Sequence, residues 1–200
     1  MSTFWNDASF EPKRNYRFQV TIGNSTTPAN MGGVQFWAKT CDTPSFDVTE
    51  VEHNYYDNKY YYPGRVIWNT ISMTVVDPVD VNICYALCKS LQDANYNVKA
   101  NTNDRKSISK GTATTSLGDA MTIRVFSAAG DKAVEEWTLN NFFLQSAKFG
   151  SLDYSSDELK QIDMTFRYDW ASIEDTLNAK SKLFVVATNN SSDGSGGPNE

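Results

Sequence analysis

The chain has 200 residues, 40% of them hydrophobic, and a formal net charge of −6. This length fits a single domain, or a domain with a small appendage. The acidic balance and the lack of a concentrated Lys/Arg run argue against tight binding of nucleic-acid phosphates, and no apolar run is long enough to span a membrane. The 10 Tyr, 11 Phe and 5 Trp residues favour β-structure, because large side chains fit pleated surfaces.

Two strands are predicted near the N-terminus. Between Lys13 and Ile22 apolar and polar residues alternate, which is typical of a half-buried strand. A loop with Gly, Pro and Asn follows over residues 23–33, and a second strand is expected from Val34 to Cys41. The N-terminal segment lacks a basic region followed by an apolar stretch, so no signal peptide is expected.

The stretch from Phe36 to Pro78 predicts a long extended arm. A strand from Phe46 to Tyr56 leads into a tyrosine-rich tip, the chain turns back at residues 63–65, and another strand runs from Val66 to Val76. Such an arm leaves backbone donors and acceptors unpaired along its edges, and aromatic residues are enriched at interfaces. We therefore expect another chain to cover the arm. The expected inter-subunit contact residues are Phe46, Val48, Val51, Tyr55, Tyr56, Tyr60, Tyr61 and Tyr62.

The alternation along this third strand contains an irregularity. Phe46 and Val48 share one face, whereas Val51 falls on the opposite face. A β-bulge or a change of environment along the strand would explain the switch, because a one-residue slip reverses the faces. One half of the strand would then pack on its own subunit and the other half on a neighbour.

A helix is predicted to start at Asp77, which can serve as the N-cap, with Pro78 in the first helical position. It should run to about Asn95 and pack one face on a sheet. The residues of that face recur every four positions: Val79, Ile83, Leu87 and Leu91. Residues 97–119 are polar and poor in aromatic side chains, and they predict a mobile surface loop inserted in the domain.

Three more strands are expected over residues 121–126, 134–139 and 142–149, with turns at Gly130-Asp131 and Asn140-Asn141. The most regular alternation in the chain follows, and it predicts a strand whose core-facing residues are Ile162, Met164, Phe166, Tyr168 and Trp170.

Beyond this strand, Ser172 is expected to cap a short helix that contains Ile173 and Leu177. An apolar run follows at residues 183–187, and the tail 189–200 has the composition of a disordered segment. The expected fold is a single mainly β domain over residues 1–188. It consists of two packed antiparallel sheets, as a sandwich or a partly closed barrel, with one flanking α-helix and the long extended arm.

Residues that could support catalysis or metal binding are few. His53 is the only histidine and lies in an extended segment, which favours a surface position over a role as catalytic base. Cys41, Cys84 and Cys88 could join His53 in a zinc site, but the usual close ligand spacing is absent and buried Cys is a common core residue. An odd, sparse set of cysteines fits a reducing interior such as a cytoplasm. We expect no metal, no cofactor and no enzymatic activity.

The tyrosine cluster from Tyr55 to Tyr62 leaves an alternative function open. Aromatic rings of this kind stack sugars or bases, so a carbohydrate-binding β-sandwich is the alternative to an assembly subunit. A hydrolase that uses His53 or a pair of carboxylates is a third hypothesis. The cluster has few interleaved basic residues beyond Lys59 and Arg65, and its composition favours a protein interface.

Several segments together resemble the tail tube protein of contractile-tailed (myovirus-type) bacteriophages. They are RNYRFQVTI, FWAKTCDTPSFDVTEVEH, YYYPGRVIWNTISMTVVDP and KQIDMTFRYDW, and their order and spacing cover nearly the whole chain. The resemblance implies two packed sheets with a flanking helix, similar in fold to type VI secretion tube proteins. It also implies hexameric rings that stack into a hollow tube within a sheath, in a virion assembled in the host cytoplasm. The implied partners are further copies of the chain, the sheath protein, and baseplate and tail-terminator proteins, with DNA passing through and no insertion in a membrane.

A lumen that conducts DNA must let the duplex pass, and acidic or small polar side chains repel or ignore phosphate whereas a basic wall would retard it. The candidate lumen residues are Asp47, Glu50, Glu52, Asp163, Thr165 and Arg167. For these residues the alternatives are a position on the tube exterior or in a seam between subunits.

Overall fold

The computed structural model describes residues 12–23, 38–80, 82–98, 106–118, 120–128, 132–176 and 180–185. Its strands are β1 Phe18–Ile22, β2 Ala38–Cys41, β3 Phe46–Tyr55, β4 Asn58–Trp68, β5 Ile71–Val76, β6 Ala120–Phe126, β7 Ala133–Asn140, β8 Phe143–Lys148, β9 Gln161–Arg167, β10 Trp170–Asp175 and β11 Lys180–Leu183. Its helices are α1 Ile83–Asp93 and α2 Lys110–Leu117. The predicted strand residues 34–37, the turn at Gly130-Asp131 and the tail 189–200 lie outside the described residues.

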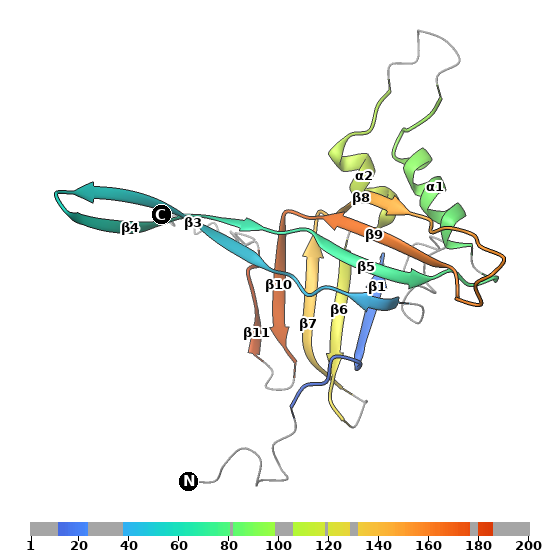
Figure 1. Ribbon diagram of the computed structural model, residues 1–200, viewed down its shortest axis with the longest axis horizontal. Coiled ribbons are helices and arrows are strands. Elements are labelled where there is room, and N and C mark those ends of the chain that lie inside the picture. Colours follow the sequence, from blue (N-terminus) through green and yellow to red (C-terminus); the bar gives the residue numbers. More distant parts are fainter. Residues whose placement is uncertain are drawn as a thin grey trace, which may run out of the picture.

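The strands form two sheets and a separate ribbon. One sheet has the order β1-β6-β7-β10-β11, the other has the order β2-β5-β9-β8, and β3 pairs only with β4. All of these pairings are antiparallel. The strands of the two sheets run across one another, and the β3–β4 ribbon leaves the body on the side away from the two helices (Figure 1). The predicted mainly β fold with packed antiparallel sheets and an extended arm is confirmed, and neither sheet closes into a barrel.

The core lies between the two sheets. Ile162, Met164 and Phe166 of β9 are at most 1% exposed, and their cross-strand partners on β5 are equally buried. The five-stranded sheet contributes residues such as Ile123 and Leu139 to the same cluster. Because Tyr168 is also buried, the core face predicted from the alternation of this segment is confirmed as far as Tyr168.

Helix α1 begins later than predicted. Its N-cap is Asn82, whose side chain accepts a hydrogen bond from the backbone N–H of Tyr85 at 2.8 Å. Asp77 instead accepts bonds from the backbone N–H of Ile83 and from Lys160, which holds its carboxylate outside the helix. Val79 and Leu91, predicted on the packed face, are 100% and 41% exposed, whereas Ile83 and Leu87 are buried as expected. The prediction of the helix start was therefore wrong, because a tertiary contact occupies the carboxylate that looked like a cap.

The segment predicted as a mobile loop over 97–119 contains helix α2. Ser109 is its N-cap and forms a reciprocal capping box with Thr112. The Thr112 hydroxyl also donates to the carbonyl oxygen of Ala94 at the end of α1, and Lys110 forms an ion pair with Asp169. These contacts hold in place a short helix that the polar sequence of the segment does not predict. For the described part of this segment, the prediction of a mobile loop was therefore wrong.

The short helix predicted after Ser172 is wrong, because residues 170–175 form strand β10. This strand pairs with β7 in a regular register, with Ala171 opposite Leu139 and Ile173 opposite Trp137. Trp170 therefore begins a new strand instead of ending β9. Ser172 is buried and its hydroxyl donates to the carbonyl oxygen of Thr138 across the sheet, so it supports strand pairing and not a helix cap.

Candidate assembly surface

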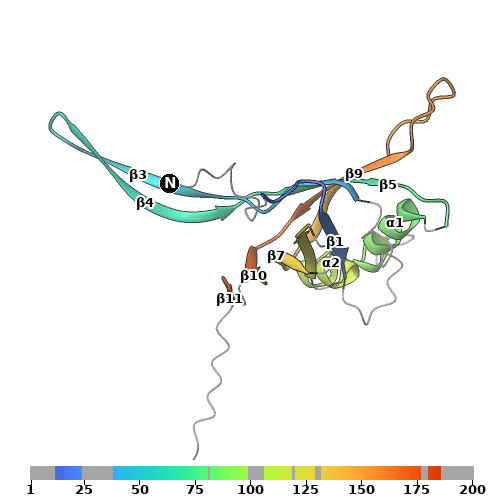
Figure 2. The same cartoon turned by 90° about the horizontal axis from the view of Figure 1, so that it is seen from below.

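The β3–β4 ribbon forms an arm that projects from the body and is continuous with the edge of the β2–β5–β9–β8 sheet (Figures 1 and 2). Every residue of β3 is exposed, and so is every residue of β4 except Trp68. The arm is anchored at its base by Asn69, whose backbone N–H donates to the carbonyl oxygen of Ser45 and whose side chain donates to Asp47. Two strands that bury so little of their own surface are not independently stable in water as a rule, which points to a covering partner.

The tip of the arm lies at Tyr56-Asp57, where Tyr56 adopts a positive φ of 51°. The turn predicted at residues 63–65 is therefore wrong. Pro63 and Gly64 lie inside β4, and Pro63 is directly opposite Glu50. A ribbon of two strands has two open edges, and proline is tolerated on an edge because it need not donate to a ladder. Strand β4 ends at Trp68, and the predicted strand from Val66 to Val76 is in fact divided between β4 and β5.

The arm contains a β-bulge, but it is not on the strand from Phe46 to Tyr56 for which a bulge or a change of environment was expected. The register shifts between the pairs Val48–Val66 and Glu50–Pro63, so Thr49 opposes both Gly64 and Arg65. The Thr49 hydroxyl oxygen accepts a hydrogen bond from the backbone N–H of Arg65 at 2.7 Å. A Cβ atom on Gly64 would lie 2.4 Å from that hydroxyl and 2.9 Å from the carbonyl oxygen of Thr49, so the bulge requires glycine here. The extra residue is on β4, and β3 alternates regularly, so Val51 lies on the opposite face from Phe46 and Val48 without a bulge in its own strand.

The bulge divides the apolar residues of the arm between its two faces. Near the body Phe46 pairs with Trp68 and Val48 with Val66 on one face. Beyond the bulge Val51 pairs with Tyr62 and His53 with Tyr60 on the opposite face, which Tyr55 extends toward the tip. We call this second set, Val51, Tyr55, Tyr60 and Tyr62, the distal face.

All eight predicted contact residues are exposed, in fractions from 48% for Tyr60 to 87% for Tyr56. Tyr61 pairs with Glu52 on the side away from the distal face, and Tyr56 lies in the turn, where its ring meets that of Tyr55 edge to face at 4.7 Å. The structure thus divides the five tyrosines, with Tyr55, Tyr60 and Tyr62 on the distal face and Tyr56 and Tyr61 outside it.

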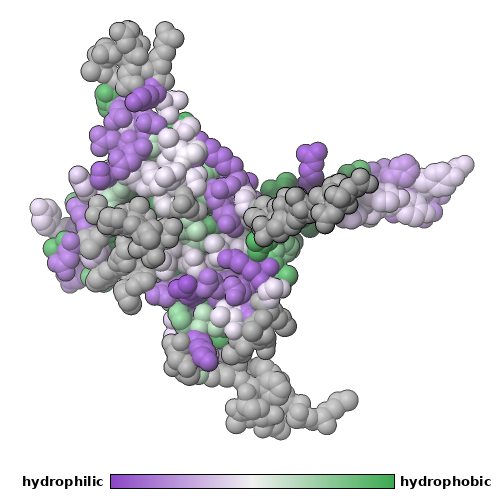
Figure 3. Space-filling model, turned by 180° about the vertical axis from the view of Figure 1, so that it is seen from behind, coloured by the Kyte–Doolittle hydropathy of each residue, from purple (hydrophilic) through white to green (hydrophobic). Residues whose placement is uncertain are grey.

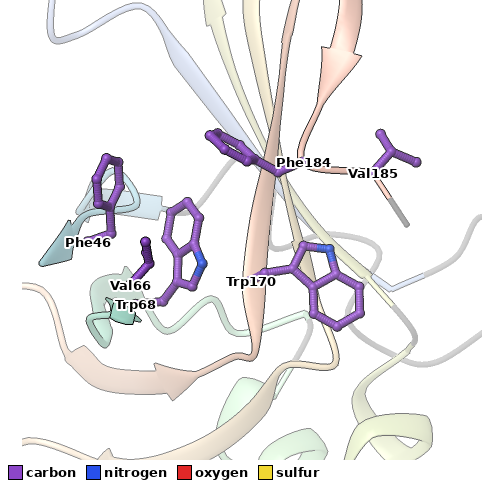
Figure 4. A pocket seen from close by; sticks show the side chains of 6 residues that line it. All are labelled: Phe46, Val66, Trp68, Trp170, Phe184 and Val185. Atoms are coloured by element: carbon purple, nitrogen blue, oxygen red, sulfur yellow. The ribbon is translucent and has the colours of Figure 1, made fainter. Parts of the chain in front are cut away.

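A pocket opens where the arm joins the body. Its volume is about 390 Å³, and its lining residues are Phe46, Val66, Trp68, Trp170, Phe184 and Val185. Figure 4 shows the arm residues Phe46, Val66 and Trp68 on one side of this space and Trp170, Phe184 and Val185 on the other. The ring of Trp68 lies 5.4 Å from that of Phe46 and 6.0 Å from that of Phe184. We call these six residues together with Val48, which continues their surface along the arm, the base groove.

The base groove was not predicted from the sequence. Trp170 was assigned to the core by its alternation with β9, and Phe184 and Val185 were part of an apolar run with no partner assigned. Only the antiparallel return of β10 and β11 brings these residues beside the arm. In the space-filling view, hydrophobic colour gathers where the arm leaves the body and fades toward the tip (Figure 3).

The candidate lumen residues fall in two separate places. Asp47, Glu50 and Glu52 lie on the arm, where Glu50 and Glu52 share one face of β3 and Asp47 lies on the other. Glu52 forms an ion pair with Lys59 at 3.0 Å across the ribbon. The structure does not bring these acids together with Asp163, Thr165 and Arg167, which lie on the sheet.

Asp163, Thr165 and Arg167 are on the face of β9 opposite the core. The Thr74 hydroxyl donates to Asp163 at 2.8 Å, so Asp163 does not depend on Arg167 for a partner. Four neighbouring side chains on this face are small or polar, namely Ser72, Thr74, Ser146 and Lys148, whereas Phe143 lies opposite Arg167 on the same face. Figure 2 shows the helices and the five-stranded sheet on the other side of this sheet, so the described elements leave this face uncovered.

One polar cluster was not predicted. Lys160 Nζ lies 2.7 Å from Asp77 Oδ2 and 3.3 Å from Cys84 Sγ, which links the segment before β9 to the start of α1. Burial acts to raise the pKa of Asp77, but the hydrogen bonds from Lys160 and Cys84 outweigh it and hold this pKa below its usual value. The cluster therefore stabilises the body when Asp77 is ionised.

The described residues contain no group of three or more His, Cys, Asp or Glu that could hold a metal ion. His53 lies on the arm, whereas Cys84 and Cys88 lie on α1, at the far side of the body (Figure 1). Burial, followed by the nearby charge of Asp42, raises the pKa of Cys41 to about 12, so its thiol stays protonated. Within the described part of the chain no helix is long and apolar enough to cross a membrane.

No protein-family model and no curated protein matches the sequence. Among solved structures, a chain from the cryo-EM structure of the anti-feeding prophage cap, its tube terminating cap, is 19% identical, with 88% of this chain and 99% of that chain covered and a TM-score of 0.58. A chain from the sheath-tube complex of an extracellular contractile injection system in its extended state is 17% identical, with coverages of 88% and 99% and a TM-score of 0.55. A chain from the anti-feeding prophage baseplate, 6-fold symmetrised, is 12% identical, with coverages of 84% and 98% and a TM-score of 0.55. The predicted resemblance to the tubes of contractile tails is thereby confirmed at the level of the fold.

Proposed function

We propose that the chain is a structural subunit of a bacteriophage contractile tail tube. Six copies form a ring, the rings stack around a hollow lumen, and the lumen conducts DNA into the host cell. The observation that carries this proposal is the arm, in which two strands of exposed apolar and tyrosine side chains leave a body that has the fold of contractile-system tube chains.

The arm supports assembly on physical grounds. A projecting ribbon has two open edges and apolar side chains on both faces, which are liabilities for an isolated protein. Closure of a symmetric ring buries such surfaces and satisfies such edges. A 6-fold arrangement is described for one structure that shares the fold, which supports the choice of a hexamer.

The uncovered face of the four-stranded sheet supports a lumen role. It carries Asp163 and Thr165 among serine and threonine side chains, which offer phosphate little attraction. Lys148 and Arg167 lie on the same face, so the wall we propose is polar and close to neutral in places, with acidic positions contributed by Asp163 and by the arm. In this arrangement the sheath contacts the outside of the tube, and baseplate and terminator proteins contact its two ends.

The role is structural and not catalytic, and the place of action is the virion tail after assembly in the host cytoplasm.

Sedimentation velocity of the purified chain, together with a glycan-binding screen, tests this proposal against the carbohydrate-binding alternative. The proposal predicts ring- or tube-sized particles and no saturable glycan binding. A monomer at all concentrations that binds a glycan through Tyr60 or Tyr62 would contradict it.

A further inference from the structure

The arm carries two separate apolar surfaces, and the bulge places them on opposite faces. The base groove lies on the face that Phe46 and Val66 share, and the distal face lies on the other side, beyond Thr49. If β4 kept the same residues and alternated regularly from Val66 without a bulge, Tyr60 and Tyr62 would point to the same side as Phe46, and Val51 would lie on the other side. The bulge therefore assembles the distal face and turns it away from the base groove of its own copy.

We propose that the distal face of one copy docks in the base groove of the next copy, so that subunits join head to tail. This inference rests on the proposed function and names the surfaces through which neighbouring subunits meet. Each copy offers one distal face and one base groove, which makes the contact heterologous. A heterologous contact closes into a ring when the rotation between copies permits it.

The base groove has the chemistry to receive such a partner. Its lining is entirely apolar and includes two Trp residues, and its volume of about 390 Å³ suits a few side chains. Phe46, Val48 and Val66 remain 49–55% exposed, so the groove is open to a second chain along the arm. Aromatic side chains in such a groove are the usual energetic centres of protein interfaces.

The distal face has the complementary chemistry. Val51, Tyr55 and Tyr62 are each 57–60% exposed, and Tyr60 is 48% exposed. Tyrosine buries a large ring while its hydroxyl stays at the wet rim of an interface. No described residue of the same copy covers this face, and it lies on the opposite side of the ribbon from the base groove of its own copy. A second copy of the chain is the partner that carries the matching surface.

Two single substitutions, each damaging one surface, test the proposal. Tyr62→Lys places a charge on the distal face and leaves the base groove intact, and Val66→Lys does the reverse. Each variant alone should lose assembly, with the critical concentration raised at least about tenfold. Mixed in equal amounts, they should form a discrete dimer of twice the 22.4 kDa chain mass, because one intact contact remains possible between the two variants.

The matched control is Tyr85→Lys. Tyr85 is 64% exposed, comparable to Tyr62 at 57%, and lies on helix α1, outside the arm and the base groove. This variant should assemble like the unmodified chain. Circular dichroism and thermal melting of all three variants should match the unmodified chain, since all three side chains are exposed.

The inference is overturned if the mixture stays monomeric although each variant is folded, if either damaging variant assembles normally, or if Tyr85→Lys loses assembly. Its failure is distinguishable from failure of the proposed function. Normal tubes from the unmodified chain with no complementation in the mixture would remove the head-to-tail contact alone. If the two variants form the expected dimer but the unmodified chain forms only open filaments, with no rings or tubes, the head-to-tail contact would stand and the tube function would be refuted.

Discussion

Gly64 is the residue on which the shape of the arm depends most directly. We expect Gly64→Ala to cost about 1–3 kcal/mol of local ribbon stability, because the new Cβ would overlap the Thr49 hydroxyl and backbone. Hydrogen exchange should become faster in β3 and β4 and stay unchanged in the body. Gly111→Ala is the matched control, since nothing lies within 4 Å of that position. Unchanged exchange in the arm of Gly64→Ala would show that the bulge tolerates a side chain.

Phe166 is the residue at which the contribution of the core to stability can be tested. Its side chain is fully buried and its ring lies 5.8 Å from that of Phe142. Phe166→Ala should lower the free energy of unfolding by about 3–5 kcal/mol, measured by denaturant titration, because the truncation leaves a cavity. Thr165→Ala, on the opposite face of the same strand, should change it by only about 0.5 kcal/mol. A Phe166→Ala protein as stable as the unmodified chain would mean that the faces of β9 are reversed.

Asp77 makes the stability of the body depend on pH. Its pKa in the folded chain is lowered, so ionisation favours the folded state at neutral pH. This contribution is complete above the unfolded-state pKa of about 4 and is lost as the pH falls through the lower folded-state pKa. Asp77→Asn should therefore lose stability at pH 7 and show a weaker decline between about pH 5 and pH 2. Parallel pH profiles for the two proteins would contradict the role of the Lys160 contact.

At the scale of elements, the parts that were predictable from the sequence are those in which local pattern and tertiary role agree. The alternation of β9 identified its buried face because one side of the strand is apolar and the other polar throughout. The position of Val51 correctly indicated that apolar residues change faces along β3, but the bulge is on the partner strand β4, where nothing in the alternation of β3 could place it.

The failures come from tertiary contacts that override local signals. Pro63-Gly64 is a strong turn signal, yet both residues lie inside a strand of the ribbon, where Pro63 occupies an edge position and Gly64 is part of the bulge. Asp77 looked like a helix cap, but Lys160, distant in sequence, binds its carboxylate. Helix α2 has a single buried residue, Leu117, and is held by Ala94 and Asp169, so no periodicity could reveal it. The base groove depends on the return of β10, which was predicted as a helix.

The proposed function assigns the arm tip to assembly and not to folding. Deletion of residues 54–61 would leave Val51 opposite Tyr62, with Glu52-His53 as a two-residue turn. We expect a folded protein that does not polymerise, because the body buries its core without the arm. Replacing Glu52-His53 by Asn-Gly in the same deletion gives a turn of favoured geometry and controls for strain at the new tip. Tubes of normal length from either deletion would refute the assembly role of the tip.

At the scale of the whole molecule, the lumen assignment predicts how charge affects transport. In a hexamer, Asp163→Lys converts a ring of negative charges to a ring of positive ones, which should bind phosphate and slow the duplex. We expect tubes that assemble normally and eject DNA slowly, with the neutral Asp163→Asn as control. Lysine substitutions at Glu50 and at Glu52 test in the same way whether the arm, as well as the sheet, contributes residues to the lumen wall. Loss of assembly would place a residue in a seam, and unchanged ejection would place it on the exterior.

Cryo-electron microscopy of particles formed by the purified protein is the decisive experiment on whether this chain builds a tube. We expect stacked rings of six subunits around an open channel, with each arm lying against a neighbouring copy and the Asp163 face of the sheet turned toward the channel. Particles without a channel, or an isolated monomer with a free arm at every concentration, would refute the proposed tube.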